Sequence, residues 1–341
     1  MKSKKVLVTG GAGYIGAHTV VELINAGFEP VIVDNLSRSD RTLLDGIETV
    51  TGYKTPFFEG DCCDKKFMTK VFESGGPFSG VLHFAAFKAV GESEEKPLIY
   101  YQNNLNSLTT LVEVMLSKKV TDLIFSSSCT VYGQPDQIPV NESAPFKKDE
   151  SAYGATKQMC EMILEDVSRN GLRVISLRYF NPIGAHPSAL LGEVPIGTPN
   201  NLVPYITQTA AGLREKLTVF GDDYNTPDGS CVRDFIHVVD VGSAHVKALQ
   251  YLAKKSEEKL YEAFNLGTGV GVSVLELIKK FIAVTKVNIP YVIGPRRPGD
   301  IEQVFADPAK VNKALNWSSN FNIDQSLLHA WQWEKRIRNI Q

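Results

Sequence analysis

Tyr153 and Lys157 lie four residues apart in the run Tyr-Gly-Ala-Thr-Lys, on one face of a predicted helix. An unperturbed tyrosine has a pKa of about 10, so its phenol is a poor base at neutral pH. A lysine ammonium on the same face favours the phenolate and is expected to lower this pKa. The pair therefore predicts a tyrosine base that takes a proton from a hydroxyl group.

Three serines, Ser126, Ser127 and Ser128, end the predicted strand that comes before this helix. Ser128, the last of them, is placed to share a hydrogen bond with the reacting hydroxyl or with the phenolate. Many helices carry a Tyr-x-x-x-Lys pair by chance. Its position after the serine-rich strand end, in a chain that also has the glycine loop described next, favours the catalytic interpretation.

A glycine-rich loop follows the first predicted strand and opens a predicted helix. Gly11, Gly13 and Gly16 have the G-x-G-x-x-G spacing, and Gly10 widens the pattern. Without side chains the backbone can turn tightly and approach a pyrophosphate, which the helix N-terminus then stabilises. The loop predicts a dinucleotide site, and the positive nicotinamide ring of a dinucleotide bound there would also favour the Tyr153 phenolate.

Asp34 closes the second predicted strand, where a carboxylate would bind the hydroxyls of an adenosine ribose. A carboxylate repels the 2′-phosphate of NADP, so the cofactor is expected to be NAD, although Arg38 nearby makes the choice less sharp. The alternative is that Asp34 only ends a strand in a turn. Asp61 and Cys62 follow the third strand and could reach the adenine, and the small residues after the fourth strand suit the phosphates and the nicotinamide ribose.

Short β-branched runs alternate with longer helical patterns in the first half, which is typical of βαβ units around a parallel sheet. The predicted strands span residues 5–8, 31–33, 81–84, 123–125 and 174–177, and the predicted helices span residues 17–26, 98–118 and 153–170. Residues 183–201 are rich in glycine and proline, and strand patterns return at 235–238 and 263–266. The predicted fold class is α/β, with a Rossmann-type doubly wound parallel sheet and a smaller mixed α/β C-terminal substrate domain. Residues 1–181, with 235–265 returning to them, would form the first domain, and residues 182–234 and 266–341 the second.

Composition excludes several classes of function. The 341 residues carry a net charge of -2, which predicts neither a nucleic-acid partner nor an anionic membrane partner. The basic N-terminus is followed by an apolar stretch that stops at Thr9, so a signal peptide is not expected, and no apolar run reaches the roughly 20 residues of a membrane span. Five cysteines, odd in number and without paired metal spacing, predict reduced thiols, a cytoplasmic location and no metal site.

Eight motifs together resemble the extended short-chain dehydrogenase/reductase family and, within it, the UDP-galactose 4-epimerases. The motifs are TGGAGYIG (9–16), DNLSRS (34–39), FAAFKAVGES (84–93), SSSCTVYG (126–133), YGATK (153–157), FNPIGAH (180–186), VRDFIHV (232–238) and RRPGD (296–300). The resemblance runs from residue 6 to about residue 333. TGGAGYIG and YGATK identify only the superfamily, whereas FNPIGAH, PNNL (199–202) and VRDFIHV are far more specific.

The resemblance implies that Tyr153 is the catalytic base, that Lys157 binds the nicotinamide ribose, and that Ser128 assists. It implies NAD contacts from Gly10, Gly13, Tyr14, Ile15, Gly16, Asp34, Asn35, Leu36, Ser37, Arg38, Ser39, Asp61, Cys62, Phe84, Ala85, Ala86, Lys88, Asn103, Ser126, Tyr153, Lys157 and Phe180. For a UDP-hexose substrate it implies contacts from Lys88, Ser128, Tyr153, Asn181, Asn201, Leu202, Thr218, Val219, Phe220, Arg233, Arg297, Asp300 and Val304. Arginine forks suit a diphosphate, although Arg233 alone could equally be a surface ion-pair residue.

The implied activity is epimerisation at C4 of the hexose by reversible hydride removal. A dehydratase is disfavoured because no carboxylate stands at 128–130, where that class needs one. Two rival functions on the same scaffold are a catalytically idle NAD-sensing regulator and a net-redox dehydrogenase. Val304 stands four residues after Asp300, where similar epimerases carry a large aromatic residue that blocks a 2-acetamido group. The small side chain of Val304 therefore predicts that the N-acetylated pair, UDP-GlcNAc and UDP-GalNAc, is also epimerised. Two alternatives are that a one-residue shift places Phe305 at this position, which would reverse the prediction, and that Val304 packs in a core.

A homodimer through a four-helix bundle is also implied by the resemblance. Apolar residues on two predicted helices would form the seam, unless both helices simply cover their own sheet. These residues are Leu108, Leu111, Val112, Met115, Met159, Met162 and Ile163.

Overall fold

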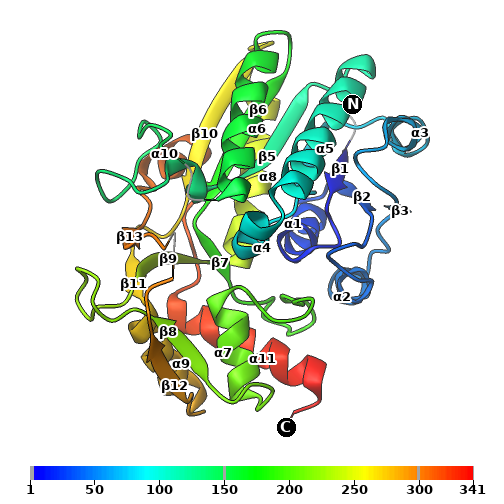
Figure 1. Cartoon of the computed structure of the whole chain (residues 1–341). Coiled ribbons are helices and arrows are strands. Elements are labelled where there is room, and N and C mark those ends of the chain that lie inside the picture. The colour runs from blue at the N-terminus through cyan, green and yellow to red at the C-terminus, as the bar shows by residue number, and fades with distance from the viewer. Residues whose placement is uncertain (1–3, 149–150, 298–299, 341) are drawn as a thin grey trace.

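A seven-stranded parallel sheet forms the larger part of the structure, a computed structural model that describes residues 4–148, 151–297 and 300–340 (Figure 1). The strand order is β10-β6-β5-β4-β1-β2-β3. Its strands are β1 (Lys5–Thr9), β2 (Glu29–Asp34), β3 (Phe57–Glu59), β4 (Gly80–His83), β5 (Asp122–Ser128), β6 (Arg173–Tyr179) and β10 (Leu260–Leu266). The order reverses between β1 and β4, and ligands of such sheets bind outside the strand ends at this switch point.

Helices cover both faces of this sheet, so its central strands are apolar on both sides. Val6, Leu7 and Val8 of β1 are all fully buried, and they point alternately into two separate apolar clusters. On one face lie α1 (Tyr14–Asn25), α2 (Thr42–Thr51), α8 (Val238–Lys254) and α10 (Ala309–Leu315). On the other lie α3 (Lys65–Gly75), α5 (Pro97–Ser117) and α6 (Ala152–Ser168). A short helix, α4 (Val90–Glu95), and a 3₁₀ turn, η1 (Cys129–Tyr132), follow β4 and β5. The predicted doubly wound α/β fold is confirmed.

A smaller mixed region lies beyond the carboxyl ends of these strands (Figure 1). Four of its strands form one sheet, in which β9 pairs with each of the other three, and two more strands form a separate two-stranded sheet. The strands are β7 (Asn181–Ile183), β8 (Leu217–Phe220), β9 (Val232–His237), β11 (Gly271–Ser273), β12 (Tyr291–Gly294) and β13 (Gln303–Val304). Its helices are α7 (Leu202–Ala210), α9 (Val274–Thr285) and α11 (Ile323–Arg338), which share an apolar cluster with these strands.

The chain returns to the large sheet at α8 and β10, because β9 pairs with β7, β11 and β13 of the small region instead. The strand pattern at 235–238 therefore belongs to the small sheet, and the return starts a few residues later than the pattern indicated. The exact division into two domains stays a prediction.

Four histidines are at most 3% exposed and are held neutral by their surroundings. Burial lowers the pKa of each well below the usual 6.5, to about 4 or about 3. They are His18, His83, His237 and His245.

The helices that were expected to form a dimer seam divide their apolar residues between core and surface. On α5 the residues Leu108, Leu111, Val112 and Met115 are buried against the sheet, so they cover their own core rather than a seam. On α6 the side chains of Met159 and Met162 are 41% and 59% exposed, and Ile163 packs partly against the same core.

Candidate active site

The glycine loop between β1 and α1 is shaped by close backbone approaches. Gly10 has φ +72°, and a Cβ there would lie 2.7 Å from the Ala85 nitrogen, while a Cβ on Gly16 would lie 2.3 Å from the Gly10 oxygen. Gly13 caps α1 without any side-chain hydrogen bond, so the first N–H groups of the helix face outward to a ligand. This bare turn fits the pyrophosphate of a dinucleotide.

Asp34 ends β2 beside this loop and is 9% exposed. Its Oδ2 accepts a hydrogen bond from the Ala12 nitrogen at 3.1 Å, and its Oδ1 accepts from the Leu36 nitrogen and the Ser39 hydroxyl at 2.9 and 3.0 Å. Burial raises the pKa of this carboxyl, while these hydrogen bonds lower it. Oδ1 thus uses both of its lone pairs, whereas Oδ2 keeps one for a ribose hydroxyl. Asp34 is therefore both a structural anchor of the loop and a fitting ribose ligand.

The proposed catalytic groups meet at the end of β5 and the start of α6. Lys157 is 3% exposed, and its Nζ donates to the Ser126 carbonyl at 2.6 Å. The same Nζ lies 5.8 Å from the centre of the Tyr153 ring. Ser151 caps α6 by accepting from the Gly154 nitrogen, which fixes the first turn and with it Tyr153.

The pKa of Tyr153 differs from the expectation. Burial raises it to about 12, and a side-chain hydrogen bond with Ser128 acts in the opposite direction. Burial lowers the pKa of Lys157 to about 8. The tyrosine pKa in the ligand-free protein is therefore raised rather than lowered, because the phenol is desolvated, and the Lys157 ammonium donates to a carbonyl instead of to the phenol. A further positive charge is needed to make Tyr153 a base at neutral pH.

Two arginines converge on one carboxylate across the cleft. Nε and NH2 of Arg297 donate to Asp300 at 3.2 and 2.6 Å, and NH2 of Arg233 lies 3.8 Å from the same carboxylate. Burial raises the pKa of the Cys129 thiol, next to Ser128, and the charge of Arg233 lowers it by a smaller amount. The two middle residues of the RRPGD motif, 298–299, lie outside the described residues. The predicted diphosphate ligands Arg233 and Arg297 thus share Asp300 as a partner, and the charge of Arg233 reaches the thiol next to Ser128.

Asn181, predicted to hold the sugar nucleotide, carries a buried Oδ1 with no hydrogen-bond partner among the described residues. Buried polar atoms are normally satisfied, so an orphan acceptor here indicates a missing ligand or water. Phe180 and Val304 share one apolar cluster with Val131 and Tyr132, and Val304 is only 3% exposed. Val304 therefore packs in a small core behind the site, in agreement with the core-packing interpretation of its sequence position.

The remaining predicted residues are spread over several elements. On the cofactor side Arg38 pairs with Glu92 at 2.9 Å, and Asn35 contacts Asp61 at 3.4 Å. On the substrate side Phe220 is 42% exposed beneath the Arg297 guanidinium, whereas Val219 is 1% exposed and can offer only its backbone. The others lie in the loops after β2, β3 and β4 (Ser37, Cys62, Phe84, Ala86), in α1, α5 and α7 (Ile15, Asn103, Leu202) and in β8 (Thr218).

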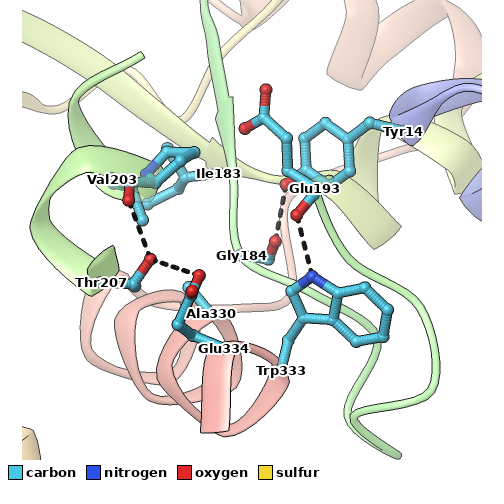
Figure 2. Close-up of a pocket in the computed structure, with 10 residues that line it drawn as sticks. Tyr14, Ile183, Gly184, Glu193, Val203, Thr207, Ala330, Trp333 and Glu334 are labelled. Carbon is cyan, nitrogen blue, oxygen red and sulfur yellow. Dashed lines mark hydrogen bonds between the residues drawn. The ribbon is translucent and has the colours of Figure 1, made fainter. Parts of the chain in front are cut away.

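A residue that the sequence did not single out lies between the two sides. Glu193 accepts from Lys88 Nζ at 3.0 Å and from Asn201 Nδ2 at 2.8 Å, both at Oε1. Figure 2 shows it at the rim of a cavity of about 20 Å³, which has room for about one water molecule and is too small for the substrate. Glu193 stands in the segment 183–201, whose sequence has no periodic pattern. The only sequence signal for it is a charged residue in a stretch rich in glycine and proline.

Comparison with known proteins identifies the family of this site. The model of the NAD dependent epimerase/dehydratase family matches residues 6–267. The chain belongs to this family. Its cofactor is NAD, in agreement with the bare glycine turn and the carboxylate of Asp34.

Individual relatives match over almost the whole length. The UDP-glucose 4-epimerase of Dictyostelium discoideum is 48% identical, over 97% of this chain and 95% of its own. The structure of UDP-glucose-4-epimerase from Stenotrophomonas maltophila with bound NAD and formylated UDP-arabinopyranose superposes with a TM-score of 0.94, at 45% identity over 99% of both chains. That of the Bifidobacterium longum UDP-glucose 4-epimerase with NAD+ and UDP also gives 0.94, at 43% identity over 99% of this chain and 100% of that one.

Proposed function

We propose that the protein interconverts UDP-galactose and UDP-glucose by oxidising and re-reducing C4 of the hexose. One observation carries this proposal: Ser128 ends β5 and Tyr153 and Lys157 begin α6, in the same sheet whose β1 end carries the glycine turn, while the Arg233–Asp300–Arg297 group stands in the small region beyond those strand ends. A base and a dinucleotide site thus share the carboxyl ends of one sheet, and a diphosphate site stands in the region beyond them. The names of the nearly full-length relatives support the same activity.

Tyr153 takes the proton of the 4-hydroxyl group and later returns it to the same oxygen. Bound NAD supplies the reversible hydride acceptor and a positive ring charge. Ser128 donates a hydrogen bond that stabilises the phenolate, in line with its lowering effect on the Tyr153 pKa. Lys157, fixed by the Ser126 carbonyl, orients the nicotinamide ribose and adds positive charge beside the phenol.

Binding energy belongs on the nucleotide rather than on the hexose, because the 4-keto sugar must turn over to receive hydride on its other face. Arg233 and Arg297 make charge-assisted contacts with the diphosphate, and in doing so they exchange their shared partner Asp300 for the ligand. Asp300 then becomes free to meet the uridine ribose. Asn181 directs its unpaired acceptor to the sugar nucleotide.

The N-acetylated pair, UDP-GalNAc and UDP-GlcNAc, belongs to the proposed substrate range. Val304 is small, and it lies in register with Arg233 on the neighbouring strand. An aromatic side chain there would fill space that a turning 2-acetamido group needs.

A homodimer in the cytoplasm is the proposed working form. The exposed side chains of Met159 and Met162 on α6 favour a partner on that face. All five cysteines are free, which suits a reducing compartment. In the described part of the chain no helix is long and apolar enough to cross a membrane.

Incubation with UDP-galactose without added cofactor tests the proposal. Chromatography should show UDP-glucose forming while absorbance in the NADH band stays flat. A rise in that band in proportion to product would identify a net dehydrogenase instead. The variant Tyr153→Phe should lose about 10²–10⁴-fold in rate, the usual contribution of a general base, while keeping its fold and its NAD.

A further inference from the structure

Glu193 connects Lys88, which follows β4 near the predicted cofactor site, to Asn201, a predicted substrate residue at the start of α7. Lys88 comes from the loop after β4, and its Nζ lies 5.9 Å from the centre of the Tyr14 ring beside the glycine turn. Asn201 is the N-cap residue of α7, but its side chain makes no capping bond and donates to Glu193 instead. One carboxylate oxygen thus holds one donor from each side, at 3.0 and 2.8 Å.

The carboxylate stands on a firmly packed segment. The Glu193 carbonyl accepts from the Trp333 indole at 2.9 Å, and Figure 2 shows the side chain pointing away from that ring. A Cβ on the preceding Gly192 would lie 2.3 Å from the indole, so the backbone lies directly against it. The Glu193 side chain is 15% exposed, whereas that of Lys88 is 56% exposed. The more buried Glu193 carboxylate therefore holds the more exposed Lys88 ammonium in place.

Holding Lys88 in place matters for the affinity of an anionic ligand. A free lysine side chain loses rotamer entropy when it is fixed. If the protein has already fixed the ammonium, the ligand does not bear that cost, and affinity rises through preorganisation. The same carboxylate holds the Asn201 amide, which therefore does not cap its own helix.

We propose that Glu193 is a positioning residue that holds Lys88 and Asn201 in the geometry that binds the nucleotide sugar. Its role rests on the proposed function, since both donors are assigned to that substrate. Glu193 does not touch the reacting carbon, so its loss should act on substrate affinity and leave the chemical step intact.

Two variants separate its charge from its hydrogen bonds. In Glu193→Gln the side-chain oxygen can still accept from Asn201, but the charge opposite Lys88 is gone. Glu193→Ala removes both interactions. Glu113→Ala is the matched control, because it breaks the Lys65–Glu113 pair of 2.8 Å, whose side chains are more than 60% exposed.

KM and kcat for UDP-galactose, and the Kd for UDP by calorimetry on NAD-loaded protein, are the measurements. Glu193→Ala should raise both KM and Kd by about tenfold, the effect of losing one hydrogen bond to a charged group. Its kcat should stay within about twofold of wild type. Glu193→Gln should lie between the alanine variant and wild type, and Glu113→Ala should match wild type.

Three results would overturn the proposal: unchanged KM and Kd, a loss confined to kcat, or a lowered Kd, which would mean that the carboxylate competes with the ligand. If the alanine variant fails to fold in a thermal melt, the glutamine variant alone decides, since it keeps the shape of the side chain. Binding of UDP needs no turnover. A wild type that binds UDP without epimerising would therefore contradict the proposed function and still leave Glu193 open to this test.

Discussion

The pKa of Tyr153 should lie near 12 in NAD-free protein and fall to about 9 when NAD binds. Burial raises the pKa to about 12, so about 10⁻⁵ of the phenol is ionised at pH 7. Ionising the phenol at this pH therefore costs about 7 kcal/mol. A unit positive charge at about 4 Å in an effective dielectric of about 20 contributes about 4 kcal/mol. That energy corresponds to a fall of about three in pKa.

Difference spectroscopy at the tyrosinate band measures this pKa directly. The chain has 12 tyrosines, so the titration of Tyr153→Phe is subtracted from that of the wild type, once without NAD and once with it. The difference isolates one phenol in each state.

Two outcomes would refute the reasoning. A pKa near 10 or below in NAD-free protein would mean that burial does not control this phenol. A pKa that is the same with and without NAD would mean that the cofactor charge does not reach it, and Lys157 would have to lower the pKa alone.

Three further perturbations follow from the structure. Asp34→Ala should weaken NAD binding by about tenfold or more, because a charged acceptor is lost, and should relax the discrimination against NADP. If a cofactor titration shows an unchanged preference for NAD over NADP, Asp34 is only a structural residue at the strand end. Val304→Tyr should abolish turnover of the N-acetylated sugars while UDP-galactose turnover survives. Overpacking should lower the free energy of unfolding by about 1–3 kcal/mol in a denaturant melt. Equal loss of both activities, or a wild type without N-acetyl turnover, would contradict this prediction. The free energy of unfolding should be nearly constant between about pH 6.5 and pH 7.5 and should fall by up to about 2 kcal/mol per buried histidine at pH 5, because the unfolded state takes up protons that the buried imidazoles do not; urea titrations at pH 7 and pH 5 that give the same value would exclude this.

The histidine effect has a limited pH window. The pKa values of Glu22, Asp34, Asp234 and Asp240 are raised by burial. These carboxyls gain protons in the folded state first, so they oppose the loss as the pH falls toward the range in which carboxyls titrate. The comparison therefore belongs between pH 7 and pH 5.

The residues whose role depends on backbone spacing were predictable from the sequence. Gly10, Gly16 and Asp34 follow strands, and strand ends of a parallel sheet share one edge, so their placement follows from the alternating pattern. Lys157 and Tyr153 share a helix face for the same local reason. These features need no knowledge of long-range packing.

Features that depend on long-range contacts were not predictable. Val304 follows Asp300 at the expected spacing, yet its burial is decided by Phe180 and Tyr132 from other parts of the chain. The pairing of β9 with β7 and β13 depends on segments more than 50 residues away. The pKa of Tyr153 depends on desolvation, which a helix-face argument does not include.

The fate of the hydrogen at C4 tests the central claim most directly. UDP-galactose that carries deuterium at C4 is incubated with the protein in ordinary water, and the UDP-glucose formed is analysed by mass spectrometry. Removal and return of a hydride within one closed site predicts that the product keeps its deuterium at C4. Exchange of that deuterium for solvent hydrogen, or failure to form UDP-glucose at all, would contradict the account.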